Sequence, residues 1–279
     1  MKNWLVSTVI ALSLFGVFLN KTYAATSWIK PVFGIREEFD DNVFLTGSDE
    51  SSDRVTTIAA GLNFEPQLNR HEFSASYIVD FQMLADNSDQ NTTNQTVDAK
   101  GTLNFNDWRV EADTVLRHFE NRAGSEDTAR VPRTSDTTNV KLIYAFNKLD
   151  VGLNYTYRLE NYRSDNGIGT YAGQALTYQD LDSNENAGEA ELAFQFWPKT
   201  ELLFSGRYGT LEYDTGKKGD SEYYDVLTGL RGQFFKKGEI EGKIGYRSQN
   251  YEDSAQDFDS VIFSASLIEK FTEKDTLTI

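Results

Sequence analysis

Histidine is the side chain most often used for proton transfer in enzymes, and this sequence has two, His71 and His118. A Ser-His-Asp arrangement also needs a nucleophile and a carboxylate that converge on the imidazole. Asp113 and His118 are an odd number of positions apart, so in an extended strand they point to opposite faces. The sequence contains no cysteine, which removes thiolate nucleophiles and thiolate metal ligands. We therefore expect no catalytic residue, no cofactor and no enzymatic activity.

Two segments rich in Asp and Asn are similar to cation-binding loops. Asp182-Ser-Asn-Glu-Asn-Ala-Gly188 has the spacing of a calcium loop at its start, but its glycine comes one place late and its twelfth position is Ala193. Asp and Asn are also common in turns, where they accept hydrogen bonds from their own backbone. Weak calcium or magnesium binding stays open here and at Asp40-Asp-Asn42, and we assign no metal ligand.

Charged residues recur at every second position in many segments, which is the pattern of a β-strand with two different faces. Between residues 149 and 160 the odd positions are all apolar or aromatic, and the even positions include Asp150, Arg158 and Glu160. The pattern predicts twelve strands, at residues 28–38, 54–65, 71–83, 95–106, 108–120, 137–147, 149–163, 186–197, 200–214, 221–235, 239–252 and 258–271, and the start of a thirteenth at 275–279.

Short turns and long loops alternate between these strands. The short turns each follow an aromatic residue: Phe64, Phe105, Phe146, Trp197, Phe235 and Phe271. The long loops are polar: 39–53, 84–94, 121–136, 164–185, 215–220 and 252–257. A soluble sandwich would have loops of similar length at both ends, whereas this rhythm is typical of an outer-membrane β-barrel, in which one face of each strand meets lipid.

The predicted fold is therefore all-β, a transmembrane antiparallel up-and-down β-barrel. The aromatic residues at the short turns would form one interfacial belt. A second belt is expected near the long loops, at Tyr162, Tyr213, Tyr223 and Tyr251. Because bacterial barrels usually have an even number of strands, we expect a C-terminally truncated form of a barrel with 14–18 strands.

The first 24 residues have the features of a secretory signal peptide. Lys2 is followed by a mostly apolar run from Trp4 to Leu19, and Thr22-Tyr-Ala24 is a suitable cleavage site. The run is shorter than the about 20 residues of a transmembrane helix. We expect export through the Sec pathway, with residues 25–279 forming a single barrel domain in the outer membrane of a Gram-negative bacterium.

The formal net charge of −16 makes nucleic acid an unsuitable partner, because its phosphates would be repelled. Acidic loops would attract divalent cations, or would simply keep the loops solvated. Both interpretations stay open.

The charged residues of the strands are expected to line the lumen. The lumen-lining residues are Arg109, Glu111, Asp113, Arg117, Lys141, Arg158, Arg207, Arg231, Lys243 and Arg247, with Asp150, Glu160, Glu189, Glu191 and Glu241 beside them. Such residues either pair into a network that rigidifies a blocked interior or line water and act on passing polar solutes. We also expect the loop that carries Arg122, Glu126, Arg130 and Arg133 to fold inward as a constriction.

Several short motifs are similar to those of a known family. They are Phe39-Asp-Asp-Asn-Val-Phe-Leu-Thr46, Gly61-Leu-Asn-Phe64, Arg70-His-Glu-Phe73, Asp80-Phe81, Asn94-Gln95, Arg130-Val-Pro-Arg133, Pro198-Lys-Thr200 and Gly245-Tyr-Arg247. In this order they resemble the putative β-barrel porin 2 family over nearly all of the mature chain. The resemblance implies an outer-membrane barrel associated with exopolysaccharide production and export, and it implies no catalytic residue.

These observations predict a porin-like channel linked to exopolysaccharide export or surface polysaccharide handling, with passive passage through a charged lumen. The alternative is a non-conducting structural or docking barrel whose acidic loops bind divalent cations, lipopolysaccharide or matrix polysaccharide. The expected partners are outer-membrane lipid and lipopolysaccharide, the barrel-assembly machinery, and polysaccharide with its export machinery.

Overall fold

The structure is a computed structural model, and it describes residues 28–44, 50–66, 68–122, 130–171, 173–233, 238–252, 257–270 and 276–278. The expected signal peptide, residues 1–24, lies outside the described residues, as does Glu126. Within the described ranges, no helix is long and apolar enough to cross a membrane.

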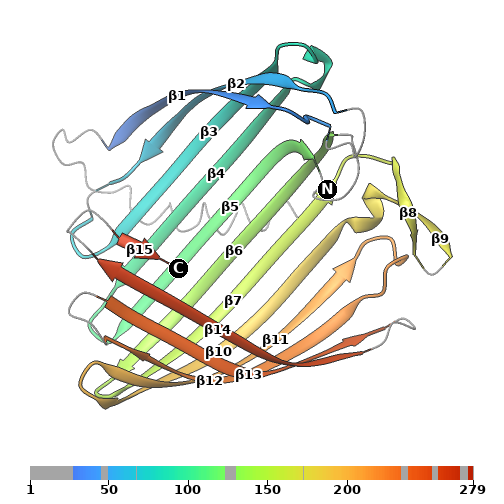
Figure 1. Cartoon of the computed structure of the whole chain (residues 1–279). Coiled ribbons are helices and arrows are strands. Elements are labelled where there is room, and N and C mark those ends of the chain that lie inside the picture. The colour runs from blue at the N-terminus through green and yellow to red at the C-terminus, as the bar shows by residue number, and fades with distance from the viewer. Residues whose placement is uncertain are drawn as a thin grey trace. The chain divides into compact units, whose positions relative to one another are not determined.

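Long antiparallel strands make up most of the chain (Figure 1). Neighbouring strands of the main sheet follow one another in sequence, apart from β8 (Gly167–Tyr171) and β9 (Gln174–Thr177), which form a separate two-stranded sheet. The main sheet consists of β1 (Ile29–Asp40), β2 (Asp53–Phe64), β3 (Glu72–Leu84), β4 (Thr92–Asn104), β5 (Trp108–Arg122), β6 (Arg130–Phe146), β7 (Leu149–Tyr162), β10 (Ser183–Trp197), β11 (Thr200–Tyr213), β12 (Ser221–Gly232), β13 (Gly238–Tyr251), β14 (Phe258–Lys270) and β15 (Thr276–Thr278). The predicted all-β, up-and-down antiparallel fold is confirmed, and the described residues contain twelve long strands and a short thirteenth in this sheet. β1 and β15 stand at the two ends of the order.

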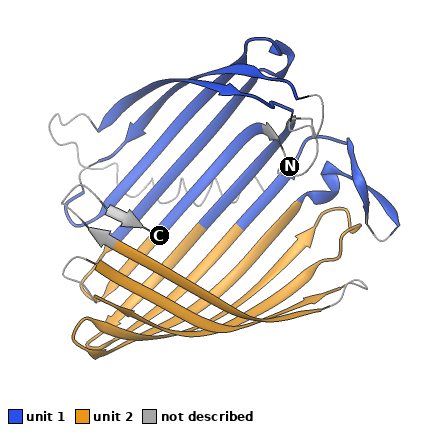
Figure 2. Cartoon of the chain, viewed as in Figure 1, with its two compact units in different colours: residues 1–103, 112–138, 158–182 blue, residues 104–111, 139–157, 183–279 orange. Residues whose placement is uncertain are grey.

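The chain divides into two compact units (Figure 2). Unit 1 contains residues 1–103, 112–138 and 158–182, and unit 2 contains residues 104–111, 139–157 and 183–279. The boundary passes through β5, β6 and β7, so each of these strands contributes to both units.

In unit 2, the hydrogen-bond register of β10–β13 pairs odd-numbered residues with odd-numbered residues on the neighbouring strands. Arg207 of β11 is opposite Glu189 of β10 and Asp225 of β12, and Asp225 is opposite Arg247 of β13. Successive residues of a strand point to opposite faces, so odd-numbered residues share one face of these four strands and even-numbered residues share the other. We call them the polar face and the apolar face of unit 2.

The apolar face is the more exposed of the two. On β13, Ile244 is 57% exposed, whereas the neighbouring Lys243 side chain is only 14% exposed. On β12, Val226 is 63% exposed and Asp225 is 3% exposed. This is the reverse of a soluble protein, in which apolar side chains are covered and charges meet water. It is the arrangement expected of a sheet whose apolar face is solvated by lipid.

Among the described residues, aromatic side chains gather at the short-turn ends of the strands; Phe235 and Phe271 of the predicted belt lie outside the described residues. In unit 1 the rings of Phe64 and Phe73 lie 5.9 Å apart. In unit 2, Tyr144 contacts both Trp108 and Phe146 with ring centroids 4.4 Å apart. These rings, with Leu142, Val151 and Leu153, line an apolar hollow of about 500 Å³.

Two predicted loops were partly wrong. β6 begins at Arg130 rather than at residue 137, so the end of the predicted loop 121–136 is a strand. The predicted loop 164–185 contains the hairpin of β8 (Gly167–Tyr171) and β9 (Gln174–Thr177), and then a short 3₁₀ helix, η2 (Tyr178–Leu181).

The predicted second aromatic belt was also partly wrong, because two of its tyrosines lie with polar side chains. Tyr223 is 6% exposed and lies on the polar face with Asp225. Tyr162 stacks on Tyr178 of η2, with ring centroids 5.9 Å apart.

Candidate functional site

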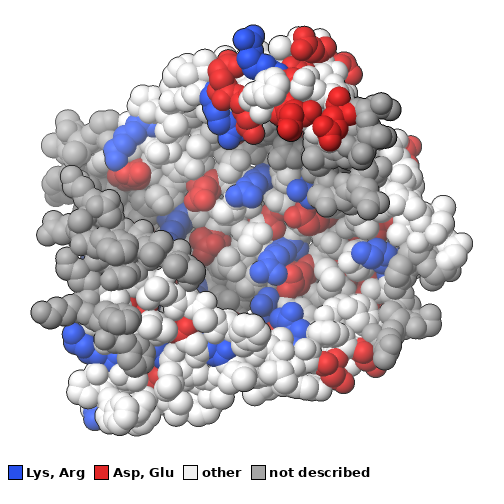
Figure 3. Space-filling model, viewed as in Figure 1, with Lys and Arg blue, Asp and Glu red and all other residues white. Residues whose placement is uncertain are grey.

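The polar face of unit 2 carries rows of alternating charge. One row runs across four adjacent strands from Glu189 through Arg207 and Asp225 to Arg247. A second row places Arg231 between Glu201 and Glu241. Opposite charges on neighbouring strands attract each other, so the register that buries this face also places opposite charges on neighbouring strands beside one another. Basic and acidic side chains are likewise interspersed in the space-filling view (Figure 3).

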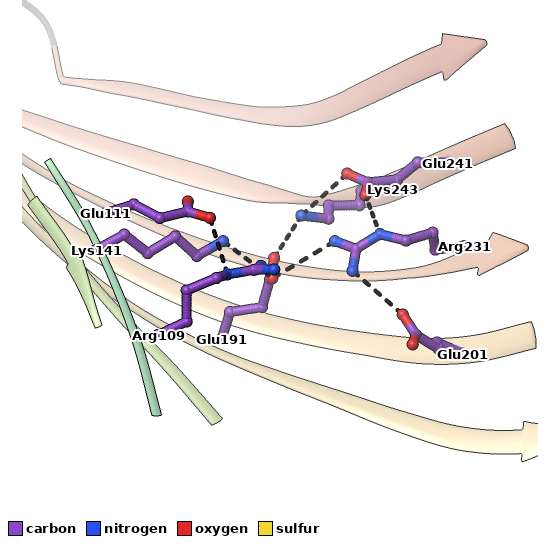
Figure 4. Close-up of polar contacts among 8 residues, drawn as sticks. All are labelled: Arg109, Glu111, Lys141, Glu191, Glu201, Arg231, Glu241 and Lys243. Atoms are coloured by element: carbon purple, nitrogen blue, oxygen red, sulfur yellow. Dashed lines mark hydrogen bonds and ion pairs between the residues drawn. The ribbon is translucent and has the colours of Figure 1, made fainter. Parts of the chain in front are cut away.

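Glu191 of β10 lies at the centre of the larger cluster (Figure 4). Its Oε2 lies 2.7 Å from Lys243 Nζ, and its Oε1 lies 3.6 Å from Arg231 Nη2 and 3.8 Å from Lys141 Nζ. The Glu191 side chain is 14% exposed. One carboxylate is thus shared by cations from β6, β12 and β13.

Two further carboxylates complete this cluster from the other side. Arg231 Nε donates to Glu241 Oε2 at 2.7 Å, and its Nη1 lies 3.2 Å from Glu201 Oε2. Lys243 Nζ also lies 3.2 Å from Glu241 Oε1. We name the Glu191 network by its members: Lys141, Glu191, Glu201, Arg231, Glu241 and Lys243. Charge-assisted hydrogen bonds of this kind are stronger than neutral ones, so the network stiffens the polar face of unit 2, the wall of the candidate site.

A second cluster surrounds Tyr223, nearer the long loops. The Tyr223 hydroxyl donates to Glu185 Oε1, and Arg207 Nη2 lies 3.2 Å from the same oxygen. The guanidinium groups of Arg207 and Arg247 lie 5.3 and 5.0 Å from the centre of the Tyr223 ring, within the range of cation–π attraction. Arg247 also holds Asp225 with two hydrogen bonds of 2.7 Å. We call these five residues the Tyr223 cluster.

The structure brings together five of the ten residues predicted to line the lumen. Lys141, Arg231 and Lys243 belong to the Glu191 network, and Arg207 and Arg247 belong to the Tyr223 cluster.

The other five are residues of β5 and β7. Arg109 and Glu111 pair with each other on β5, with Arg109 Nε 2.9 Å from Glu111 Oε1. Asp113 and Arg117 continue the same side of β5 by strand alternation. Arg158 is an exposed residue of β7.

The predicted constriction is not a single loop. Arg122 ends β5 and Arg130 begins β6, and their side chains lie outside the described residues. Arg133 is a strand residue within unit 1. Its guanidinium lies 4.4 Å from the centre of the Phe119 ring, and its Nη1 donates to the Tyr162 hydroxyl at 3.3 Å. Arg133 is thus a strand residue in contact with aromatic rings of the neighbouring strands β5 and β7.

Four members of the clusters were missed as site residues: Glu185, Glu201, Tyr223 and Asp225. Glu185 lay within the calcium-like segment, and Tyr223 within the predicted tyrosine belt. Each has the same parity as a predicted lumen residue on its own strand, so alternation alone would have found them. Their pairing partners, by contrast, depend on register between strands.

The acidic segments considered for cations accept hydrogen bonds from other groups of the protein. Asp182 accepts from the backbone N–H of Tyr162 at 2.6 Å and from Asn161 Nδ2 at 3.1 Å. Asp40 Oδ1 accepts from the backbone N–H of Asn42 at 3.0 Å. His118 Nδ1 lies 3.1 Å from the Thr134 hydroxyl, in a contact between neighbouring strands.

A family model described as putative beta-barrel porin 2 matches residues 23–279. The chain belongs to this family. It is therefore a porin-like β-barrel protein of the outer membrane, and the resemblance drawn from its motifs is confirmed. No curated protein is significantly similar to this porin-family chain in sequence.

Solved outer-membrane proteins show distant similarity to this porin-family chain. The NanC porin is 13% identical with a TM-score of 0.38, covering 86% of this chain and 99% of its own. OmpT of Vibrio cholerae, expressed in the outer membrane, is 12% identical with a TM-score of 0.46, covering 88% and 99%. OpdK of Pseudomonas aeruginosa, solved with vanillate, is 13% identical with a TM-score of 0.39, covering 87% and 77%.

Proposed function

We propose that this porin-family protein is a passive outer-membrane channel whose polar face borders a water-filled lumen. Polar solutes would pass the charged side chains of unit 2 by diffusion, without a covalent step. The observation that carries the proposal is the contrast between the two faces of β10–β13. Charged side chains fill one face, whereas Val226 and Ile244 on the other are more than half exposed. Fixed charges beside water act on passing solutes through their field.

We further propose that the channel serves exopolysaccharide export or surface polysaccharide handling. This part rests on the family resemblance, since members of the family are associated with exopolysaccharide production. The paired charges of the polar face add hydrogen-bond donors and acceptors that suit a hydroxyl-rich chain. Deleting the gene in its host should reduce secreted polysaccharide, and unchanged secretion would count against this part.

The second candidate is a non-conducting docking barrel, with the Glu191 network acting as part of a rigid, blocked interior. The observation in its favour is that Lys141, Arg231 and Lys243 are all paired with carboxylates. Conductance separates the two candidates, because a blocked interior carries no current.

Cysteine labelling during planar-bilayer recording tests the channel directly. The chain has no native cysteine, so a single introduced thiol reacts without background. Ser264 and Phe263 are neighbours on β14, and Ser264 is opposite Lys243, which places it on the polar face. Phe263, on the other face, is 83% exposed.

A charged, membrane-impermeant thiol reagent should reduce the current through S264C and leave F263C unchanged. The absence of conductance in the unsubstituted protein would favour the docking barrel. Equal reaction at both positions would contradict the assignment of the two faces.

A further inference from the structure

The side chains of Lys243 and Lys141 reach Glu191 by extending over the strands that separate their own strands from β10. Lys243 is on β13 and Glu191 is on β10, and β11 and β12 lie between these strands in the sheet. The 2.7 Å contact between Nζ and Oε2 therefore spans two intervening strands. Lys141 reaches Glu191 from β6, with β7 between them.

Glycines beneath these long side chains make room for them. A Cβ added to Gly229 of β12 would lie 2.8 Å from Lys243 Cγ. A Cβ added to Gly152 of β7 would lie 3.6 Å from Lys141 Cε and 3.7 Å from Glu191 Cβ. Both lysine side chains thus lie along the surface of the sheet, and their ammonium groups meet at one carboxylate.

The arrangement leaves these cations little freedom to meet a solute. The Lys243 side chain is 14% exposed and the Arg231 side chain is 28% exposed. Each is already paired with Glu191 and with Glu241. An anionic group passing this wall would have to compete with carboxylates that are held in place by the sheet.

We propose that Glu191 is a specificity-determining residue of this channel: it holds Lys141, Arg231 and Lys243 against the wall and so withholds them from anionic solutes such as uronate sugars. This inference rests on the proposed channel function. Neutralising Glu191 removes the carboxylate that Lys141 and Lys243 share and leaves Lys243 with Glu241 alone, so the lysine side chains can extend further from the polar face. The attraction of the wall for anions then increases by more than the removal of one negative charge alone would produce.

The test compares E191Q with E189Q. Glu189 lies on the same face of the same strand, and within the described residues it has no ion pair. E189Q therefore removes one carboxylate without releasing a cation. One unit charge about 6 Å from a passing ion in water changes the local ion concentration about threefold.

The first readout is the reversal potential in a potassium chloride gradient. E189Q calibrates the effect of one lost charge, and E191Q should shift the chloride-to-potassium permeability ratio about threefold further. The double variant E191Q/K243Q should return most of this excess shift. An E191Q shift no larger than that of E189Q, or one that K243Q leaves in place, would overturn the inference.

The second readout needs no conductance, so it separates this inference from the proposed function. Acylation of lysine amines in the folded protein, followed by mass spectrometry, reports how free each ammonium group is. Lys243 should react about tenfold faster in E191Q, and at the original rate in E189Q, because a paired and covered amine reacts slowly. Equal Lys243 rates in E191Q and the unsubstituted protein would overturn the inference even if the channel conducts.

If E191Q does not fold, K243Q tests the same pair, since releasing Glu191 should shift selectivity toward potassium, and no shift would overturn the inference.

Discussion

At the scale of single residues, Gly242 and Gly245 of β13 differ in how much space surrounds them. A Cβ on Gly245 would overlap the carbonyl oxygen of Val226 and lie 2.7 Å from Leu227 Cα, whereas a Cβ on Gly242 would meet nothing within 4 Å. Gly245→Ala should lower the free energy of unfolding by about 1–3 kcal/mol, the usual range for overpacking. Urea unfolding in lipid vesicles measures this change. Gly242→Ala is the matched control on the same strand, and equal midpoints for the two variants would contradict the close approach of backbone at Gly245.

Asp53 begins β2 at the long-loop end, beyond the about 11 residues that a strand needs to cross a bilayer. It is 1% exposed and accepts hydrogen bonds from the backbone N–H groups of Arg54, Ala85, Asp86 and Asn87 and from the Asn87 side chain. Burial alone would raise its pKa, but the hydrogen bonds from Asn87, Asp86 and Arg54 outweigh burial and lower the pKa from 3.8 to about 2. Because the pKa is lower in the folded state, the stabilisation from the Asp53 carboxylate is complete above pH 3.8 and is lost as the pH falls toward 2.

The prediction for Asp53 is local opening of the turn at Ala85–Asn87 in acid. Hydrogen-exchange protection factors of these amides should fall between pH 5 and pH 2. In Asp53→Asn they should be low at both values, because a neutral amide is a weaker acceptor and does not titrate. Equal protection in the unsubstituted protein at both pH values would show that Asp53 does not hold this turn.

At the scale of elements, Asp182 and Tyr178 attach the segment that carries β8, β9 and η2 to Tyr162 of β7. Asp182 accepts the backbone N–H of Tyr162 at 2.6 Å, and Tyr178 of η2 stacks on the Tyr162 ring and is 1% exposed. Asp182→Ala should make trypsin cleavage after Arg163 about tenfold faster, since losing hydrogen bonds to a charged acceptor costs about 1.5–3 kcal/mol. Asp165→Ala changes an exposed carboxylate of the same segment and should leave the rate unchanged. Similar rates for the two variants would show that Asp182 does not fix this segment.

The sequence was sufficient to locate most strands, but not those in which the residues on the two faces have similar polarity. Alternation located β7 because every odd residue from 149 to 159 is apolar or aromatic, and it located β12 and β13 from three such residues at even positions of each strand. Residues 130–136 contain Thr134-Ser-Asp136, which is polar on both faces, so their strand structure depends on pairing with neighbouring strands. The hairpin of β8 and β9 was missed for a related reason: it is short, and Gly169 and Gly173 adopt positive φ angles that weaken any strand pattern.

The same limit applies to the candidate site. Strand parity predicted that Lys141, Arg231 and Lys243 share a face with Glu191, and the structure places them there. Parity cannot say that Lys243 contacts Glu191 across two strands, because that contact depends on the register of three hairpins and on the space above Gly229. Alternation was thus sufficient to predict which residues share this face, but not that Glu191 is the carboxylate they share.

At the scale of the whole molecule, every functional statement depends on which solvent meets each face of the sheet. Val226 and Leu227 are neighbours in the middle of β12, and they point to opposite faces. Val226 is 63% exposed on the apolar face, whereas Leu227 is opposite Ser205 and Gly245 on the polar face. Val226→Arg should lower the free energy of unfolding in bilayers by about 2–4 kcal/mol, because an arginine near the bilayer midplane must leave water.

Leu227→Arg makes the same chemical change one position along the chain and should cost much less. Its guanidinium would lie on the polar face, in the same cross-strand row as Glu191, where the proposed lumen would supply water. Urea unfolding of both variants in the same vesicles measures the difference, with heat-dependent gel migration as the check that each has inserted. If the two arginines are tolerated equally, lipid does not solvate the apolar face. In that case the exposure of Val226 and Ile244 would need a protein partner in place of the membrane.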